Sequence, residues 1–140
     1  MGERFERGRR KLQEIDAEQL GRIVAGLQDT APDFANYLIE FPFGDIYTRP
    51  GLDLRARQIA TIAALTALGT AGPQLRVHIH GALNVGCTRT EIIEVIMQMA
   101  IYDGFPAALN GLAAAKDVFA ERKTACPVEE KIGSLTVTKN

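Results

Sequence analysis

Residues 57–86 read RQIATIAALTALGTAGPQLRVHIHGALNVG and carry the clearest structural pattern in the chain. The first half is almost wholly apolar and predicts a central helix from about Asp53 to Leu68, with Gly69 in the usual stop position. Pro73 opens a second helix and Gly86 closes it. Two consecutive helices, one of them rich enough in apolar residues to be buried, favour an all-α domain.

The flanking sequence extends the helical pattern in both directions. Asp16 and Gln19 have the spacing of a helix cap, as do Thr88 and Glu91. No strand pattern of period two occurs before residue 132. The expected helices cover about residues 16–28, 32–39, 53–68, 73–85, 88–103 and 106–123. The sequence therefore predicts a single-domain, all-α bundle of about six helices over residues 1–123, followed by a tail at residues 124–140.

The segment FPFGDIYTRPGL (41–52) interrupts the helices with two prolines and two glycines. It has no hydrophobic period and predicts an ordered loop. It contains more aromatic and charged side chains than a simple connecting loop usually has, namely Phe43, Asp45, Tyr47 and Arg49. Two interpretations stay open: a loop that contributes to a site, or a packed loop with a satisfied ion pair.

Composition excludes several function classes. The 140 residues carry 16 basic and 17 acidic side chains, a formal net charge of -1, which points to neither nucleic acid nor an anionic membrane as a partner. The apolar run at 59–68 is too short to span a bilayer, and the charged N-terminal residues are unlike a signal peptide. A soluble, cytoplasmic chain is expected. Cys87 and Cys126 are spaced for neither a zinc cluster nor a redox pair.

His78 and His80 are the only histidines. Residues two apart on a helix point about 200° from each other, so the two imidazoles cannot share a metal ion. His78 falls inside the apolar arc of its helix and is expected to face the packed side or a cavity beside it. His80 lies on the other side with Arg76 and Asn84, toward a polar face or subunit boundary. The residues alone leave His78 open between a hydrogen-bonded core histidine and a general acid or base.

Three segments, FGDIYTRPGL (43–52), RQIATIAALTALG (57–69) and QLRVHIHGALNVGCTRTEIIEVIMQMAIYDGFPAALN (74–110), closely resemble γ-carboxymuconolactone decarboxylases. The resemblance covers roughly residues 4–122. It implies the all-helical fold of the alkylhydroperoxidase D-like superfamily, assembled as a homotrimer or homohexamer. It also implies a cofactor-free enzyme of the protocatechuate branch of aromatic catabolism, which takes a small carboxylated lactone and needs no metal.

The implied reaction converts 4-carboxymuconolactone to the 3-oxoadipate enol-lactone. Losing carbon dioxide pushes electrons through the ring double bond onto the lactone carbonyl oxygen, so the substrate is its own electron sink. His78 matches the histidine that the family keeps in this helix, which implies the proton donor. His80 falls where relatives can carry other residues, so it is kept as the second candidate and as a substrate contact at most.

The resemblance also suggests which residues hold the substrate. Arginine binds carboxylates through paired hydrogen bonds, and Arg49, Arg57 and Arg76 are the candidates, of which Arg57 matches a family arginine. Tyr47 or a nearby backbone amide is the candidate for stabilising the oxyanion. Asp45 is expected to orient an arginine or an imidazole.

The peroxidase branch of the superfamily carries a Cys-x-x-Cys before the histidine, and these positions hold Ala71 and Gln74 here. A thiol peroxidase is therefore not expected, and Cys87 is expected to pack rather than react. Two alternatives remain: an enzyme of the same fold acting on another lactone, a quinone or a cyclic keto acid, and a non-catalytic ligand-binding relative. Substituting His78 would change stability but no turnover in the second.

Overall fold

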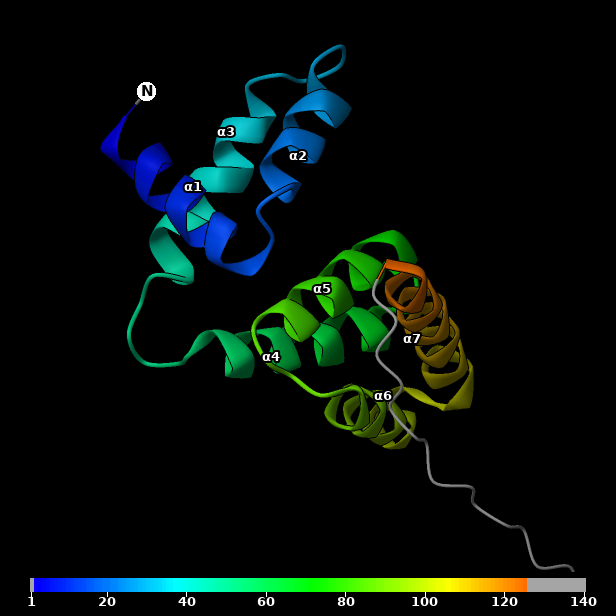
Figure 1. Ribbon diagram of the computed structural model, residues 1–140. Helices are drawn as coiled ribbons and strands as arrows, with labels where there is room; N and C mark the ends of the chain where they lie inside the picture. Colours follow the sequence, from blue (N-terminus) through cyan, green and yellow to red (C-terminus); the bar gives the residue numbers. More distant parts are fainter. Residues whose placement is uncertain (1, 126–140) are drawn as a thin grey trace, which may run out of the picture.

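The computed structural model describes residues 2–125, which are almost entirely helical (Figure 1). The elements in chain order are α1 (Glu3–Ile15), α2 (Gln19–Leu27), α3 (Phe34–Leu38), the π-helix η1 (Ile39–Ile46), α4 (Leu54–Leu68), α5 (Gly72–Asn84), α6 (Arg89–Asp103) and α7 (Phe105–Ala125). Figure 1 shows the first three helices in one group and α4–α7 in another. The all-α prediction is confirmed.

Side-chain caps and a glycine set the boundaries of α4 and the start of α6, whereas Asp16 does not cap α2, which begins at Gln19 without a side-chain cap. The Asp53 carboxylate accepts a hydrogen bond from the Ala56 amide at 2.8 Å and starts α4. The Thr88 hydroxyl accepts from the Glu91 amide at 3.0 Å and starts α6. Gly69 ends α4 with a φ of 71°, in the left-handed region where glycine avoids the steric cost of a Cβ.

Two segments correct the sequence-based expectations. Helix α1 was not among the expected helices. Its residues are mostly charged or polar, but Phe5, Leu12 and Ile15 form a narrow buried stripe along it. Residues 41–46 were expected to be loop and instead form most of η1. Pro42 has no N–H to donate, and the chain winds more widely there, so that the Tyr47 amide donates to the Pro42 carbonyl five residues back at 2.8 Å. The predicted tail falls mostly at residues 126–140, outside the described residues.

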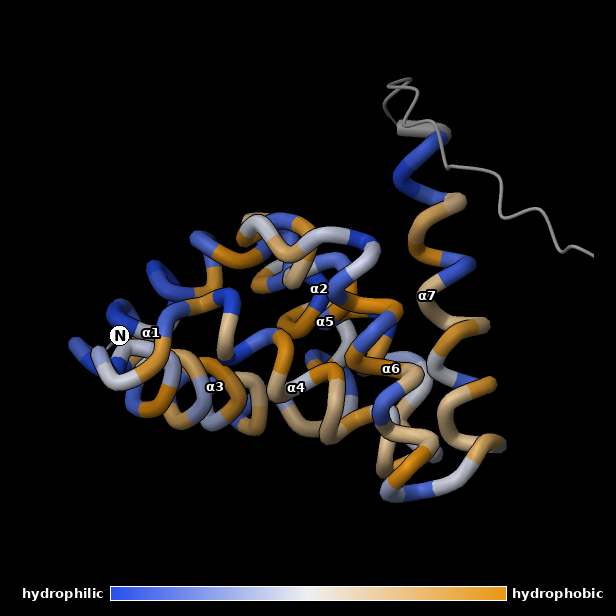
Figure 2. Tube along the Cα trace, turned by 90° about the horizontal axis from the view of Figure 1, so that it is seen from below, coloured by the Kyte–Doolittle hydropathy of each residue, from blue (hydrophilic) through white to orange (hydrophobic). Residues whose placement is uncertain are grey.

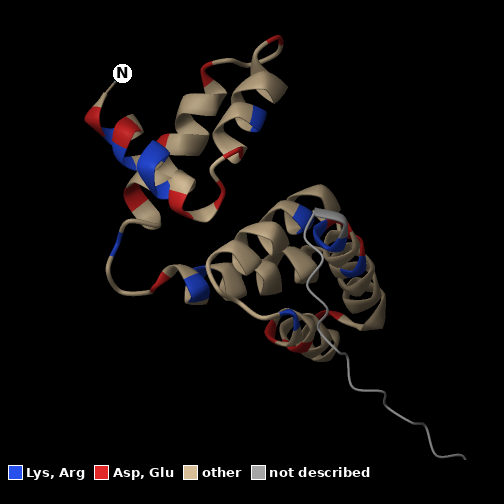
Figure 3. Ribbon diagram, viewed as in Figure 1, with Lys and Arg blue, Asp and Glu red and all other residues tan. Residues whose placement is uncertain are grey.

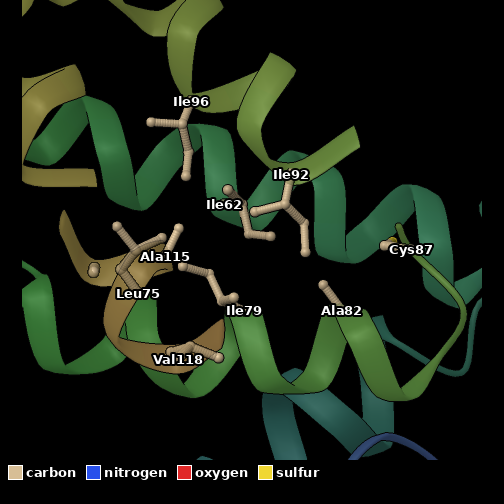
Figure 4. Close-up of a cluster of buried hydrophobic side chains, with 10 residues drawn as sticks. Ile62, Leu75, Ile79, Ala82, Cys87, Ile92, Ile96, Ala115 and Val118 are labelled. Carbon is tan, nitrogen blue, oxygen red and sulfur yellow. The ribbon is translucent and has the colours of Figure 1, made fainter. Parts of the chain in front are cut away.

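Two apolar clusters hold the elements together. The larger lies among α4–α7, where Ile62, Ile79, Ile92 and Ile96 are fully buried (Figure 4). Hydrophobic residues recur along α7 in alternation with hydrophilic ones, the pattern of a helix with one buried side (Figure 2). The smaller cluster joins α1 to η1 through Phe5, Leu12, Ile15, Ile39 and Phe43. Over residues 2–125, no helix combines the length and apolar character that crossing a membrane requires.

The contact between α1 and η1 depends on two glycines. A Cβ added to Gly8 would stand 2.2 Å from the Ile39 carbonyl oxygen and 3.0 Å from the Gly44 nitrogen. Since both atoms belong to the backbone, neither can move without shifting η1. The absence of a side chain at Gly8 therefore sets how closely the two helices approach.

We expect Gly8→Ala to lower the free energy of unfolding by about 1–3 kcal/mol or more, because the added methyl group overpacks a backbone contact. The matched control is Gly26→Ala in α2, where an added Cβ meets nothing within 4 Å. That control should gain up to about 1 kcal/mol from helix propensity. Urea unfolding of the two variants checks the prediction, and similar midpoints for both would contradict it.

Candidate functional site

His78 lies on α5 and lines a cavity of about 300 Å³ between the α1–α3 group and the α4–α5 pair. The cavity walls are mostly apolar and come from Leu12, Ile15, Ile23, Leu38, Phe43, Pro73, Val77 and Gly81. The polar lining residues are Asp16, Gln19, Gln58, Gln74 and His78. The His78 imidazole is half-buried and faces this cavity beside the packed face of its helix, as the helical periodicity predicted.

Gln58 is the contact of His78 that the sequence analysis missed. It lies in the first half of α4, is fully buried, and its side-chain oxygen Oε1 stands 3.1 Å from His78 Nδ1. The signal available in the sequence was the single amide side chain in the predicted helix from Asp53 to Leu68. Periodicity alone cannot show that this amide faces the histidine of the next helix, because that depends on how α4 and α5 cross.

Burial lowers the pKa of His78 below its ordinary value, and no charged group contributes to the shift. Desolvation penalises the imidazolium, so the ring is neutral at neutral pH in the unliganded chain. One nitrogen then carries the proton and the other a lone pair. Such a ring can accept a proton, and it can donate one after an anionic ligand has favoured its charged form.

His80 lies outside this cavity, in a polar network between α5 and α7. The Arg122 guanidinium lies 3.4 Å from His80 Nδ1, and His80 Nε2 lies 2.9 Å from the Glu121 carboxylate. Arg76 joins the network through Asp117 at 3.0 Å and through Glu121. The two histidines occupy separate sites, as their spacing on the helix predicted.

Asp45 holds α1 against η1. It pairs with Arg4 and, at 3.2 Å, with Arg7, and these cations lower the pKa of its carboxyl group. In Figure 3 charged residues are dense on α1 and beside it, where this cluster lies. The arrangement fits the second interpretation of the 41–52 segment, a packed segment with a satisfied ion pair, and the partners of that pair come from α1. A role for Asp45 in orienting a catalytic group stays a prediction.

Tyr47, Arg49 and Arg57 meet where the chain enters α4. The Tyr47 hydroxyl lies 2.9 Å from the Thr61 hydroxyl, and the Arg57 guanidinium lies 5.7 Å from the centre of the Tyr47 ring. Arg57 also donates to the Arg49 carbonyl at 3.0 Å. Together these contacts clamp the connecting turn onto α4. None of these three residues lines the cavity beside His78, and neither does Arg76. Their binding of a carboxylate stays a prediction.

Two observations on the described part of the chain bear on metal and thiol chemistry. Residues 2–125 contain no group of three or more potential metal ligands. Cys87 is buried, and burial raises the pKa of its thiol. Since the thiolate is the reactive form, this cysteine suits packing better than catalysis.

Taken together, the fold and the cavity define an all-α protein with a half-buried imidazole in a mostly apolar cavity, and no cysteine of residues 2–125 lines that cavity. Residues 32–117 match the model of the carboxymuconolactone decarboxylase family. The chain belongs to this family, whose fold is all-α and alkylhydroperoxidase D-like.

Three relatives extend the comparison. A 4-carboxymuconolactone decarboxylase of Acinetobacter baylyi is 34% identical over 118 residues, 84% of this chain and 87% of the relative. An uncharacterised 15.0 kDa protein of Paracoccus denitrificans is 38% identical over 70% of this chain and 74% of its own length. A nitrosuccinic acid decarboxylase of Metarhizium robertsii is 32% identical over 54% of this chain and 52% of its own length.

The lowered pKa of His78 predicts how stability depends on pH. As pH falls below about 6.5, the unfolded chain binds a proton at this histidine more readily than the folded chain does. The neutral His78 therefore makes its whole contribution to the free energy of unfolding above that pH. The contribution decreases as the pH falls, until His78 is protonated in the folded chain as well.

His78→Gln should flatten this dependence between about pH 7 and about pH 5, because glutamine cannot titrate. The carboxyl groups with lowered pKa, Glu6 and Asp45, titrate below this window. Urea unfolding at a series of pH values, compared between the native chain and the variant, measures the difference. Equal pH dependence in the two proteins would contradict the assignment.

Proposed function

We propose that the chain catalyses the cofactor-free decarboxylation of 4-carboxymuconolactone to the 3-oxoadipate enol-lactone, with His78 as the proton donor. The observation that carries the proposal is a half-buried histidine facing a cavity of about 300 Å³, large enough for a small lactone. The printed name of the Acinetobacter relative, which aligns with most of both chains, supports the same substrate.

The reaction needs a proton at one stage only. The bond to the departing carboxylate breaks, and its electron pair moves through the ring double bond onto the lactone carbonyl oxygen. The resulting dienolate takes a proton at the ring carbon beside the carbonyl. His78 supplies that proton from its imidazolium form, which the anionic substrate favours on binding, and recovers it from water. One proton is consumed in each turnover.

A second candidate is decarboxylation of a different carboxylic acid in the same cavity. The name of the Metarhizium relative, a nitrosuccinic acid decarboxylase, favours this alternative. Both candidate reactions follow the same principle: the substrate loses a carboxylate as carbon dioxide, and a neighbouring group of the substrate accepts the electron pair. Lactones, quinones and cyclic keto acids of similar size are the further compounds to test.

We also propose that the working form is a homo-oligomer, a trimer or a hexamer, acting in the cytoplasm. No Lys or Arg lines the cavity within the described chain, so a carboxylated ligand needs a cation from elsewhere. A second subunit would supply it. The surface of α6 and α7 offers a contact, because Ile101, Tyr102, Phe105 and Leu109 are 60–77% exposed there.

The activity prediction is that His78→Ala loses about 100- to 10,000-fold in kcat while KM changes little, since a general acid acts mainly in the transition state. Carbon dioxide release from freshly prepared 4-carboxymuconolactone in metal-free buffer measures it. His80→Gln separates the two histidines: a loss as large as that of His78→Ala would move proton delivery to the other face of α5. No release by the native chain would exclude this substrate.

For the assembly, Leu109→Glu should shift the chain to a smaller species, because it places a charge in an apolar interface. Phe34→Glu, an exposed aromatic position on α3 outside this surface, is the matched control. Analytical ultracentrifugation gives both masses. An interface at α6 and α7 would be contradicted if Leu109→Glu had the same mass in solution as the native chain. It would also be contradicted if the native chain were a monomer.

A further inference from the structure

The side-chain amide of Gln58 has a hydrogen-bond partner at its oxygen but none at its nitrogen among the described residues. Its Oε1 meets His78 Nδ1 at 3.1 Å, whereas its Nε2 is buried and makes no hydrogen bond among the described residues. Buried amide groups are nearly always paired. Because Gln58 also lines the cavity, a molecule bound there is the natural partner for its free N–H groups.

The amide has little freedom to turn elsewhere. A Cβ on Gly81 of α5 would lie 3.6 Å from both Cδ and Nε2 of Gln58 and 2.9 Å from Cγ2 of Ile15. The glycine therefore makes room for Ile15 of α1, while the Gln58 amide lies at ordinary van der Waals distance from the same position. Because Gln58 is fully buried, its side chain is held in place before any ligand binds, as an oxyanion site requires.

A second buried group points to the same cavity. The side-chain Oε1 of Gln19 is buried without a hydrogen-bond partner in the described chain, and Gln19 lines the cavity from α2. The cavity therefore presents an unpaired donor beside the imidazole and an unpaired acceptor on another wall. An apolar ligand would leave both unsatisfied, so the occupant carries polar atoms of its own.

We propose that Gln58 works through both ends of its amide: Oε1 orients His78 by accepting from Nδ1–H, and Nε2 donates to the carbonyl oxygen of the bound lactone. This inference rests on the proposed function and deepens it, since that oxygen is where negative charge develops as carbon dioxide leaves. Tyr47, the sequence-based candidate for the oxyanion, is engaged with Thr61 and does not line the cavity.

The pairing also decides which nitrogen of His78 faces the ligand. With the proton on Nδ1 held by Gln58 Oε1, Nε2 is the nitrogen that takes a proton and passes it to the ring carbon. A reversed amide would donate to Nδ1 and leave the proton on Nε2. The two arrangements therefore predict opposite tautomers, which gives a test independent of activity.

The first measurement is the ¹⁵N NMR spectrum of the histidine-labelled native chain above the pKa of His78, with signals assigned through His78→Gln. The expected result is a dominant Nδ1–H tautomer that is lost in Gln58→Met, which is similar in size but cannot accept from Nδ1–H. In Gln58→Glu the acceptor is kept and the carboxylate raises the pKa of His78. A dominant Nε2–H tautomer in the native chain would overturn the orienting role.

The second measurement is the binding of tetronate, a butenolide enolate whose negative charge lies on oxygen, followed by calorimetry. Native chain should bind it more tightly than Gln58→Met or Gln58→Glu, both of which lack the N–H donor. Equal affinity in all three would overturn the donor role. Neither the NMR nor the binding measurement requires turnover. A failure of the role proposed for Gln58 can therefore be distinguished from a lack of activity on 4-carboxymuconolactone.

If the lactone is turned over, Gln58→Met and Gln58→Glu should both lose roughly 100- to 1,000-fold in kcat, the usual effect of removing one oxyanion donor. Gln58→Glu should in addition move the pH profile of kcat to higher pH, whereas Gln58→Met should not. A loss confined to KM would overturn the oxyanion role, because a donor to developing charge acts on kcat.

Discussion

The packing of α4 against α5 is the contact on which the rest of the site depends. Ile62 and Ile79 are fully buried where these helices meet, and the same packing places Gln58 Oε1 3.1 Å from His78 Nδ1. The same contact buries the imidazole and lowers its pKa. One packing arrangement thus supplies the position of the histidine, its hydrogen-bond partner and its neutral resting form.

The ion pairs of Asp45 and Arg76 join helices and lie outside the cavity. Asp45 is paired with Arg4 and Arg7, and Arg76 is paired with Asp117 and Glu121, all at least partly exposed to solvent. These ion pairs join α1 to η1 and α5 to α7. The cavity has one acidic lining residue, Asp16, and its other polar groups are the amides of Gln19, Gln58 and Gln74 and the imidazole of His78.

The side chains beside His78 in the cavity are amides rather than thiols. Gln74, one of the two positions at which the sequence analysis looked for a redox cysteine, lines the cavity together with Gln19 and Gln58. Cys87, the cysteine within the described residues, is buried near the Arg55 carbonyl, 3.8 Å away, and does not line the cavity.

The sequence by itself determined the helix starts and stops after residue 52 and the inward face of His78, because caps, glycines and helical periodicity act within a few residues. It did not reveal α1, whose buried stripe is narrow, nor η1, whose wide turn depends on packing against α1. Only the tertiary structure decided that Gln58 meets His78 while Arg57 and Arg76 lie elsewhere. Those contacts join residues on different helices, and the crossing of two helices is set by the shapes of both surfaces together.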